Sequence, residues 1–132
     1  AAAIKTYEQV LAKTPDNFVV LNNLAFLALE DKKLTRAEEL AKKAVSLQRE
    51  NADAADTLAQ IYIAKGDKAA ALKLYEEVAA RPIANDDVYL NYVSVLLELD
   101  KKALASRKLA SREFKSEAAK QRAESLKQQY GL

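Results

Sequence analysis

Apolar positions recur along most of the chain at the spacing of one face of an α-helix. Within residues 52–85 they stand at i, i+3, i+4 and i+7 twice, first over 55–62 and again over 71–78. Gly66 supplies a turn between the two stretches, and Pro82 ends the second, because proline lacks an N–H and restricts the residue before it. The pattern predicts two antiparallel helices, that is, a helical hairpin.

The same pattern returns every 34 residues, which a shared amino-acid bias alone does not explain. Five sets of positions keep one phase at this spacing, and together they indicate a repeat protein. These sets are Ala3, Ala37, Ala71 and Ala105; Asn17, Asn51 and Asn85; Leu24, Leu58 and Tyr92; Tyr7, Ala41, Tyr75 and Leu109; and Val10, Ala44 and Val78.

The period divides residues 1–132 into consecutive segments of one domain, with about seven helices and no strands. Residues 101–130 fit either one long helix or two, and the abrupt start suggests a fragment of a longer protein. The predicted segments are a second helix of a truncated repeat (1–17), two repeats (18–51 and 52–85), a degenerate repeat (86–114) and a C-terminal capping helix (115–132).

The hairpins resemble the tetratricopeptide repeat (TPR) family. Its signature is matched in 52–85 by Leu58, Ala59, Tyr62, Ala71 and Tyr75, although Ala55 replaces the usual bulky residue and Pro82 comes one place early. The resemblance covers about residues 1–114 and implies an all-α, right-handed superhelical solenoid of antiparallel helix hairpins. The segments 22–25 and 55–59 are also similar to bacterial envelope and exopolysaccharide-associated members, which favours the periplasm without excluding the cytoplasm.

Composition and charge narrow the possible chemistry. The chain has no Cys and no His, so the thiolate nucleophile and the commonest general base and metal ligand are both absent. We therefore expect no enzyme, no cofactor and no metal. Residues 1–100 hold 12 basic and 16 acidic side chains, whereas residues 101–132 hold 9 basic and 3 acidic. No segment reaches the roughly 20 apolar residues that span a bilayer, so we expect no membrane insertion.

In the resembled family, the first helices of successive repeats line a concave groove that holds a peptide. The resemblance implies that the amide and hydroxyl side chains at 23, 57 and 91 could hydrogen-bond such a peptide. Contacts between helices, or with water, are the alternative role for these residues. The groove-facing candidates are Val19, Asn22, Asn23, Phe26 and Glu30 in one repeat, Asp53, Asp56, Thr57, Gln60 and Ala64 in the next, and Asp87, Leu90, Asn91, Ser94 and Glu98 in the third.

The leading hypothesis is a non-catalytic scaffold module that binds a protein or peptide segment in this groove. The alternative is a structural or self-assembling piece of a larger solenoid without a soluble ligand. A carboxylate enzyme built on the pairs Asp53/Asp56 or Asp86/Asp87 is a third hypothesis, although acidic residues also favour helix N-termini in general. The candidates contain no Lys or Arg, so we expect an apolar or basic partner rather than an acidic one or a nucleic acid. The basic C-terminal helix could enter a neighbouring molecule's groove and cause weak self-association.

Overall fold

The computed structural model describes residues 2–132, which form eight α-helices and no strand. The predicted all-α fold is confirmed, and residues 101–130 form two helices rather than one. The helices are α1 (Ala2–Lys13), α2 (Phe18–Glu30), α3 (Leu34–Leu47), α4 (Ala52–Ala64), α5 (Lys68–Val78), α6 (Asp86–Glu98), α7 (Lys102–Ala110) and α8 (Glu117–Tyr130).

The asparagine series of the 34-residue period caps the first helix of each hairpin. The side chains of Asn17, Asn51 and Asn85 each accept a hydrogen bond from the backbone N–H three residues later, at 3.2, 3.1 and 3.2 Å. A side-chain oxygen at this position satisfies an N–H that has no partner within the helix. These three asparagines therefore fix where α2, α4 and α6 begin.

The turn that closes each hairpin also follows the period. Lys32, Gly66 and Asp100 all adopt left-handed backbone geometry, with φ of 58°, 87° and 60°. In each case the next residue donates its N–H to the carbonyl five positions earlier, at 2.9, 2.8 and 2.8 Å. This arrangement ends a helix with its last carbonyls satisfied, and it suits glycine best because a Cβ is disfavoured there.

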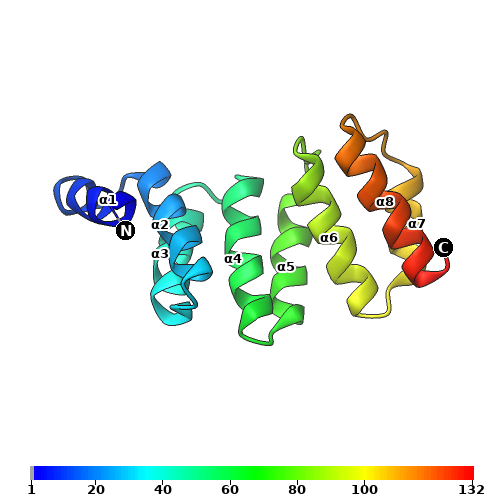
Figure 1. The fold of residues 1–132 in the computed structure, drawn as a ribbon, viewed down its shortest axis with the longest axis horizontal. Helices are drawn as coiled ribbons and strands as arrows, with labels where there is room; N and C mark the ends of the chain where they lie inside the picture. Colours follow the sequence, from blue (N-terminus) through cyan, green and yellow to red (C-terminus); the bar gives the residue numbers. More distant parts are fainter. Residues whose placement is uncertain (1) are drawn as a thin grey trace. The chain divides into compact units, whose positions relative to one another are not determined.

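The contacts between residues divide the chain into two compact units. Unit 1 ends at Val78 and contains α1 to α5. In Figure 1, α2 with α3 and α4 with α5 form neighbouring hairpins, and α3 packs against α4. Ala37 and Ala71 are completely buried, as expected for small residues that let two helices approach closely. Helix α1 packs against α2 and completes one side of this unit.

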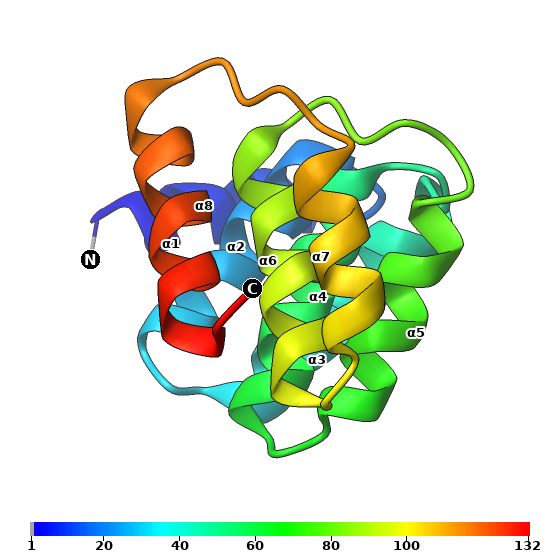
Figure 2. The ribbon, with the colours of Figure 1, turned by 90° about the vertical axis from the view of Figure 1, so that its right-hand side faces the viewer.

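Unit 2 runs from Ala79 to Leu132 and contains α6, α7 and α8. Its core is formed by the apolar side of α6, by Leu109 and Phe114, and by a narrow stripe on α8. Helix α8 packs mainly against α6 and less against α7, and Figure 2 shows α8 and α7 on opposite sides of α6 in that view. The stripe that α8 buries is Ala119, Ala123 and Leu126.

Candidate functional site

Unit 1 contains a concave pocket, which we call the α2 pocket. It encloses about 340 Å³, the size at which ligand pockets in proteins begin. Three helices of unit 1 supply its walls, and none of the lining residues is charged. The lining residues are Ala3 and Tyr7 from α1, Asn22, Asn23, Phe26 and Leu27 from α2, and Thr57 from α4.

Helix α2 presents apolar side chains to solvent on the side of this pocket. Phe26 is 51% exposed, and Val19, the second residue of the helix, is 62% exposed. The opposite side of α2 is buried in the core through Leu21, Leu24 and Ala25. A helix that is apolar on both sides, within an uncharged segment from 17 to 29, has more apolar surface than its own unit covers.

The two amides of α2 leave hydrogen-bond acceptors without partners. The Asn22 Oδ1 atom is buried and has no hydrogen-bond partner among the described residues. The Asn23 Nδ2 atom donates to the Tyr7 hydroxyl at 3.4 Å, and this bond orients the amide. No described residue donates to the Asn23 Oδ1 atom. Asn22 Oδ1 is closed to a ligand, whereas Asn23 Oδ1 is not fully buried and can accept an N–H from one.

The groove candidates on α4 are mostly engaged within unit 1. Thr57 is buried and donates its hydroxyl to the Asp53 carbonyl at 3.1 Å. The fully buried Tyr75 of α5 donates its hydroxyl to the Asp56 carboxylate and accepts from Gln60 Nε2 at 3.0 Å. Tyr75 therefore holds Asp56 and Gln60 in place on α4. These contacts serve as much to join α4 and α5 as to present polar groups to a ligand.

The groove candidates on α6 do not face an open surface. Leu90 is completely buried and belongs to the core of unit 2. Asn91 Oδ1 accepts from Arg122 Nη2 of α8 at 2.7 Å, and the same guanidinium nitrogen lies 3.4 Å from the Ser94 hydroxyl oxygen. The Ser94 hydroxyl itself donates to the Leu90 carbonyl at 2.9 Å. Of the candidates on α6, Asp87 near its start and Glu98 at its end are exposed.

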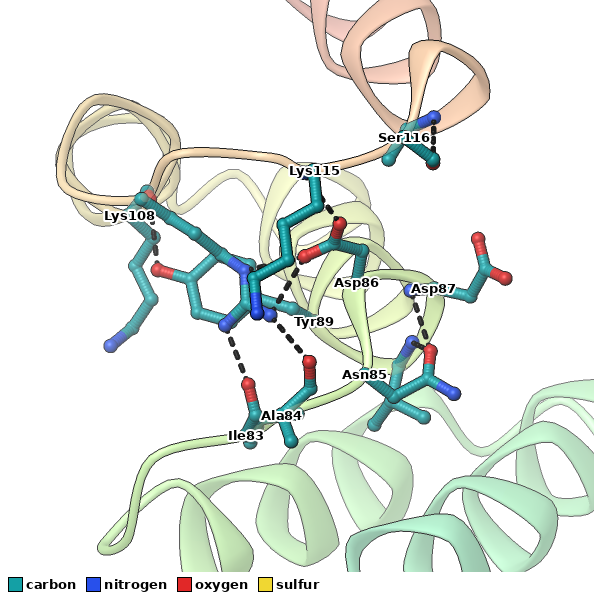
Figure 3. A network of polar contacts seen from close by, with 12 residues as sticks. Ile83, Ala84, Asn85, Asp86, Asp87, Tyr89, Lys108, Lys115 and Ser116 are labelled. Carbon is teal, nitrogen blue, oxygen red and sulfur yellow. Dashed lines mark hydrogen bonds and ion pairs between the residues drawn. The ribbon is translucent and has the colours of Figure 1, made fainter.

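A polar network that the sequence analysis missed joins the loops on either side of the α6–α7 hairpin (Figure 3). The Arg112 guanidinium donates to Asp86 Oδ1 from Nε at 2.9 Å and from Nη2 at 2.8 Å. It also donates to the carbonyls of Ile83 and Ala84, at 2.5 and 3.0 Å, and lies 4.4 Å from the centre of the Tyr89 ring. The sequence gives one indication of this network, because Arg112 stands where the repeat pattern ends.

The hydrogen bonds of this network give a structural role to Asp86, one of the carboxylates considered for acid–base chemistry. The Lys115 backbone N–H donates to Asp86 Oδ2 at 3.0 Å and, followed by the Arg112 side chain, holds the pKa of Asp86 below its ordinary value. The Asp87 carboxylate points away from this network in Figure 3. Asp86 thus acts as an acceptor for structural donors. Within residues 2–132, no three Asp or Glu side chains gather closely enough to hold a metal ion.

A second ion-pair cluster joins the two hairpins of unit 1. Glu38 on α3 contacts Lys42 Nζ and Lys65 Nζ, each at 2.6 Å. The hydrogen bond from Lys42, with that from Lys65, lowers the pKa of Glu38. Because Lys65 caps the C-terminal end of α4, this cluster ties α3 to the next hairpin.

Comparison with known proteins identifies the repeats. Two family models, both described as tetratricopeptide repeat, match residues 1–61 and residues 51–81, which together make up more than half of the chain. No curated protein sequence matches the chain. None of the helices described for residues 2–132 is long and apolar enough to cross a membrane.

Solved structures with a similar fold include a tetratricopeptide repeat protein from Parabacteroides merdae, with a TM-score of 0.77 and 19% identity over 97% of this chain and 52% of that one. YrrB, described as a TPR protein with an unusual peptide-binding site, has a TM-score of 0.71 and 22% identity over 79% of this chain and 54% of its own. MamA has a TM-score of 0.69 and 23% identity over 81% of this chain and 63% of its own. The chain therefore spans between half and two-thirds of the length of these proteins.

Proposed function

Since the chain belongs to the tetratricopeptide repeat family, whose members are generally non-catalytic protein-interaction modules, we propose that it binds a peptide or protein segment in the α2 pocket. The observation that carries this proposal is the half-exposed Phe26 beside the Asn23 amide oxygen, which has no donor among the described residues. Full burial of a Phe side chain contributes about 1.5–3 kcal/mol, and each new N–H···O bond adds specificity. The peptide-binding site named for YrrB supports the same kind of role.

The charges near the pocket favour an apolar or basic segment. Helices α2 and α4 carry three acidic side chains, Glu30, Asp53 and Asp56, and no Lys or Arg. An acidic peptide would meet like charge, whereas a basic one would gain attraction that weakens as salt rises. The same electrostatics disfavour nucleic acid as the ligand of this surface.

Isothermal titration calorimetry of the full chain tests the proposal with two sets of apolar peptides, one acidic and one basic, at low and high salt. We expect the basic set to bind more tightly, with an advantage that falls as salt rises. Phe26→Ala should weaken binding about tenfold, because it removes most of one buried aromatic contact. Leu47→Ala is the matched control, since Leu47 is 42% exposed on α3 outside the pocket. Tighter binding of the acidic set, or equal loss in both variants, contradicts the proposal.

The alternative function is a structural or self-assembling segment of a larger solenoid. It is favoured by the apolar side of α2, which a neighbouring molecule could cover. The stripe of α8 that would enter a neighbouring groove is buried against its own unit, so we expect any self-association to be weak. Sedimentation velocity across a wide concentration range distinguishes the two functions. The similarity of residues 22–25 to envelope-associated members makes a bacterial envelope assembly the first place to look for the partner.

A further inference from the structure

Two asparagines in the same position of the repeat differ in what they bind. Asn23 on α2 and Asn91 on α6 lie 68 residues apart, which is two periods. Asn91 Oδ1 accepts a 2.7 Å hydrogen bond from the Arg122 guanidinium. Asn23 Oδ1, oriented by the bond from its amide nitrogen to Tyr7, receives no donor from any described residue. The same acceptor is therefore filled in unit 2 and open in unit 1.

Arg122 reaches Asn91 because α8 packs against α6. In unit 1, α4 follows the α2–α3 hairpin and packs mainly against α3, the second helix of that hairpin. Helix α8 instead packs mainly against α6, the first helix. Ala119, three residues before Arg122, and Ala123, the residue after it, are both buried. Small residues bring the helix axis close, and the long Arg side chain then spans the remaining distance to the amide.

In the α2 pocket an arginine side chain would meet an amide oxygen, as Arg122 does on α6, and also an aromatic ring. The Asn23 Oδ1 atom of this pocket is an acceptor without a donor among the described residues, and a carboxylate could not satisfy it. The exposed ring of Phe26 stands at the position equivalent to Ser94, the second partner of Arg122. A guanidinium gains free energy over an aromatic face, as Arg112 does over Tyr89 within this chain.

We infer that the segment bound by the α2 pocket is a partner protein's amphipathic helix that carries an arginine between small apolar residues. The guanidinium donates to the amide oxygen of Asn23 and stacks on Phe26, and the small residues let the helix approach α2. Arginine suits this site better than lysine, because its planar group donates N–H bonds to an oxygen and lies flat on a ring at once. This inference rests on the proposed function and specifies its ligand.

A peptide that copies residues 116–132 of this chain is the probe, since it has the required pattern and carries its own N-cap serine. It is titrated into the full chain beside two versions with Lys or Gln in place of the arginine. We expect the Arg peptide to bind at least tenfold more tightly than the Gln peptide, with the Lys peptide between them. Asn23→Ala in the protein should weaken the Arg peptide about tenfold, while Asn91→Ala leaves its affinity unchanged.

The pair Asn23→Ala and Asn91→Ala is a matched control, because it makes the same change at the same repeat position in two units. Loss of binding only with Asn91→Ala would show that the peptide displaces α8 from α6, and would overturn the inference. Equal affinity of the Arg and Gln peptides, still dependent on Phe26, would overturn it and leave the proposed function standing. If neither these nor neutral apolar peptides bind, both fail. Dimerisation that Asn23→Ala abolishes would assign the pocket to a second copy's α8 instead.

Discussion

Replacing Arg112 with alanine removes the side chain that joins the loops on either side of the α6–α7 hairpin. The substitution deletes two N–H contacts to Asp86, two to backbone carbonyls and the stacking on Tyr89. It also leaves the Asp86 carboxylate with the Lys115 backbone N–H as its remaining partner among these contacts. We therefore expect Arg112→Ala to destabilise unit 2.

The magnitude follows from the contacts and their exposure. The Arg112 and Asp86 side chains are only 18% and 15% exposed, so solvent screens their ion pair less than a surface pair. Hydrogen bonds to charged groups contribute about 1.5–3 kcal/mol each, and an arginine over an aromatic ring about 0.5–1 kcal/mol. Because these contributions share one side chain and are not additive, we expect a loss of about 2–4 kcal/mol.

The assay is urea unfolding followed by circular dichroism, with hydrogen exchange to locate the loss in residues 79–132. Arg107→Ala is the matched control, because Arg107 is an exposed arginine on α7 whose side chain makes no hydrogen bond or ion pair with the described residues. We expect the control to change the unfolding free energy by less than about 0.5 kcal/mol. Equal effects of the two substitutions would refute the reasoning, since the network would then add nothing.

The pH dependence gives an independent test of the same network. Its Lys115 and Arg112 donors place the pKa of Asp86 below the ordinary value in the folded chain. A carboxyl whose pKa is lower in the folded state adds stability above its unfolded pKa of about 3.9 and loses it as pH falls through the folded pKa. The free-energy difference between wild type and Arg112→Ala should therefore be full at pH 7 and shrink below about pH 4. A difference that stays constant down to pH 2 would contradict this assignment.

Three further predictions concern the repeats. Lys32→Gly and Asp100→Gly should each stabilise the chain by about 0.5–1 kcal/mol in urea unfolding, and Gly66→Ala should cost about 1 kcal/mol, because all three residues have positive φ; destabilisation by either glycine would disprove the strain argument. Ala71→Leu should overpack the α4–α5 contact and cost about 1–3 kcal/mol, so an unchanged denaturation midpoint would show that the helices are not closely packed there. Glu38→Gln should cost about 0.5–1 kcal/mol at pH 7, and the cost should begin to shrink below the unfolded glutamate pKa of about 4.3 and be lost as pH falls through the lowered pKa of Glu38; a loss independent of pH would exclude the ion pairs as its source.

The fold was predictable because it depends on periodic features of the sequence. The 3.6-residue spacing predicts each helix, and the 34-residue spacing predicts which alanines are buried, as Ala37, Ala71 and Ala105 are. The asparagine series was visible in the sequence, but its capping role required knowing where each helix begins. The break between α7 and α8 could not be decided, because residues 101–130 have strong helix propensity throughout and the break at Phe114 is set by tertiary burial of its ring.

The candidate site was less predictable, because a repeat conserves the backbone position of a residue and not its hydrogen-bond partners. Asn23, Thr57 and Asn91 occupy one position of the repeat. Thr57 donates to its own helix, Asn91 accepts from α8, and Asn23 keeps an open oxygen. The difference arises from the neighbours: the hydroxyl at 57 is short enough to bond the preceding turn, and an arginine lies over the amide at 91. Period alone gives three equal candidates, whereas the contacts among the described residues leave an amide oxygen without a donor only at Asn23.

The difference between Asn91 and Asn23 explains why α8, a basic helix that is part of the fold, also indicates what kind of helix a partner would supply to α2. Helix α8 has small residues along one side and an arginine near them. These features let it pack against α6, the first helix of its hairpin. In unit 2 that contact completes a core whose α6 side chains would otherwise be exposed. In unit 1, α2 keeps an exposed phenylalanine and the Asn23 oxygen without a donor from the described residues, so its equivalent surface lacks such a covering helix. A partner that supplies a covering helix would make with α2 the contacts that α8 makes with α6. The affinity of that partner would depend on its arginine.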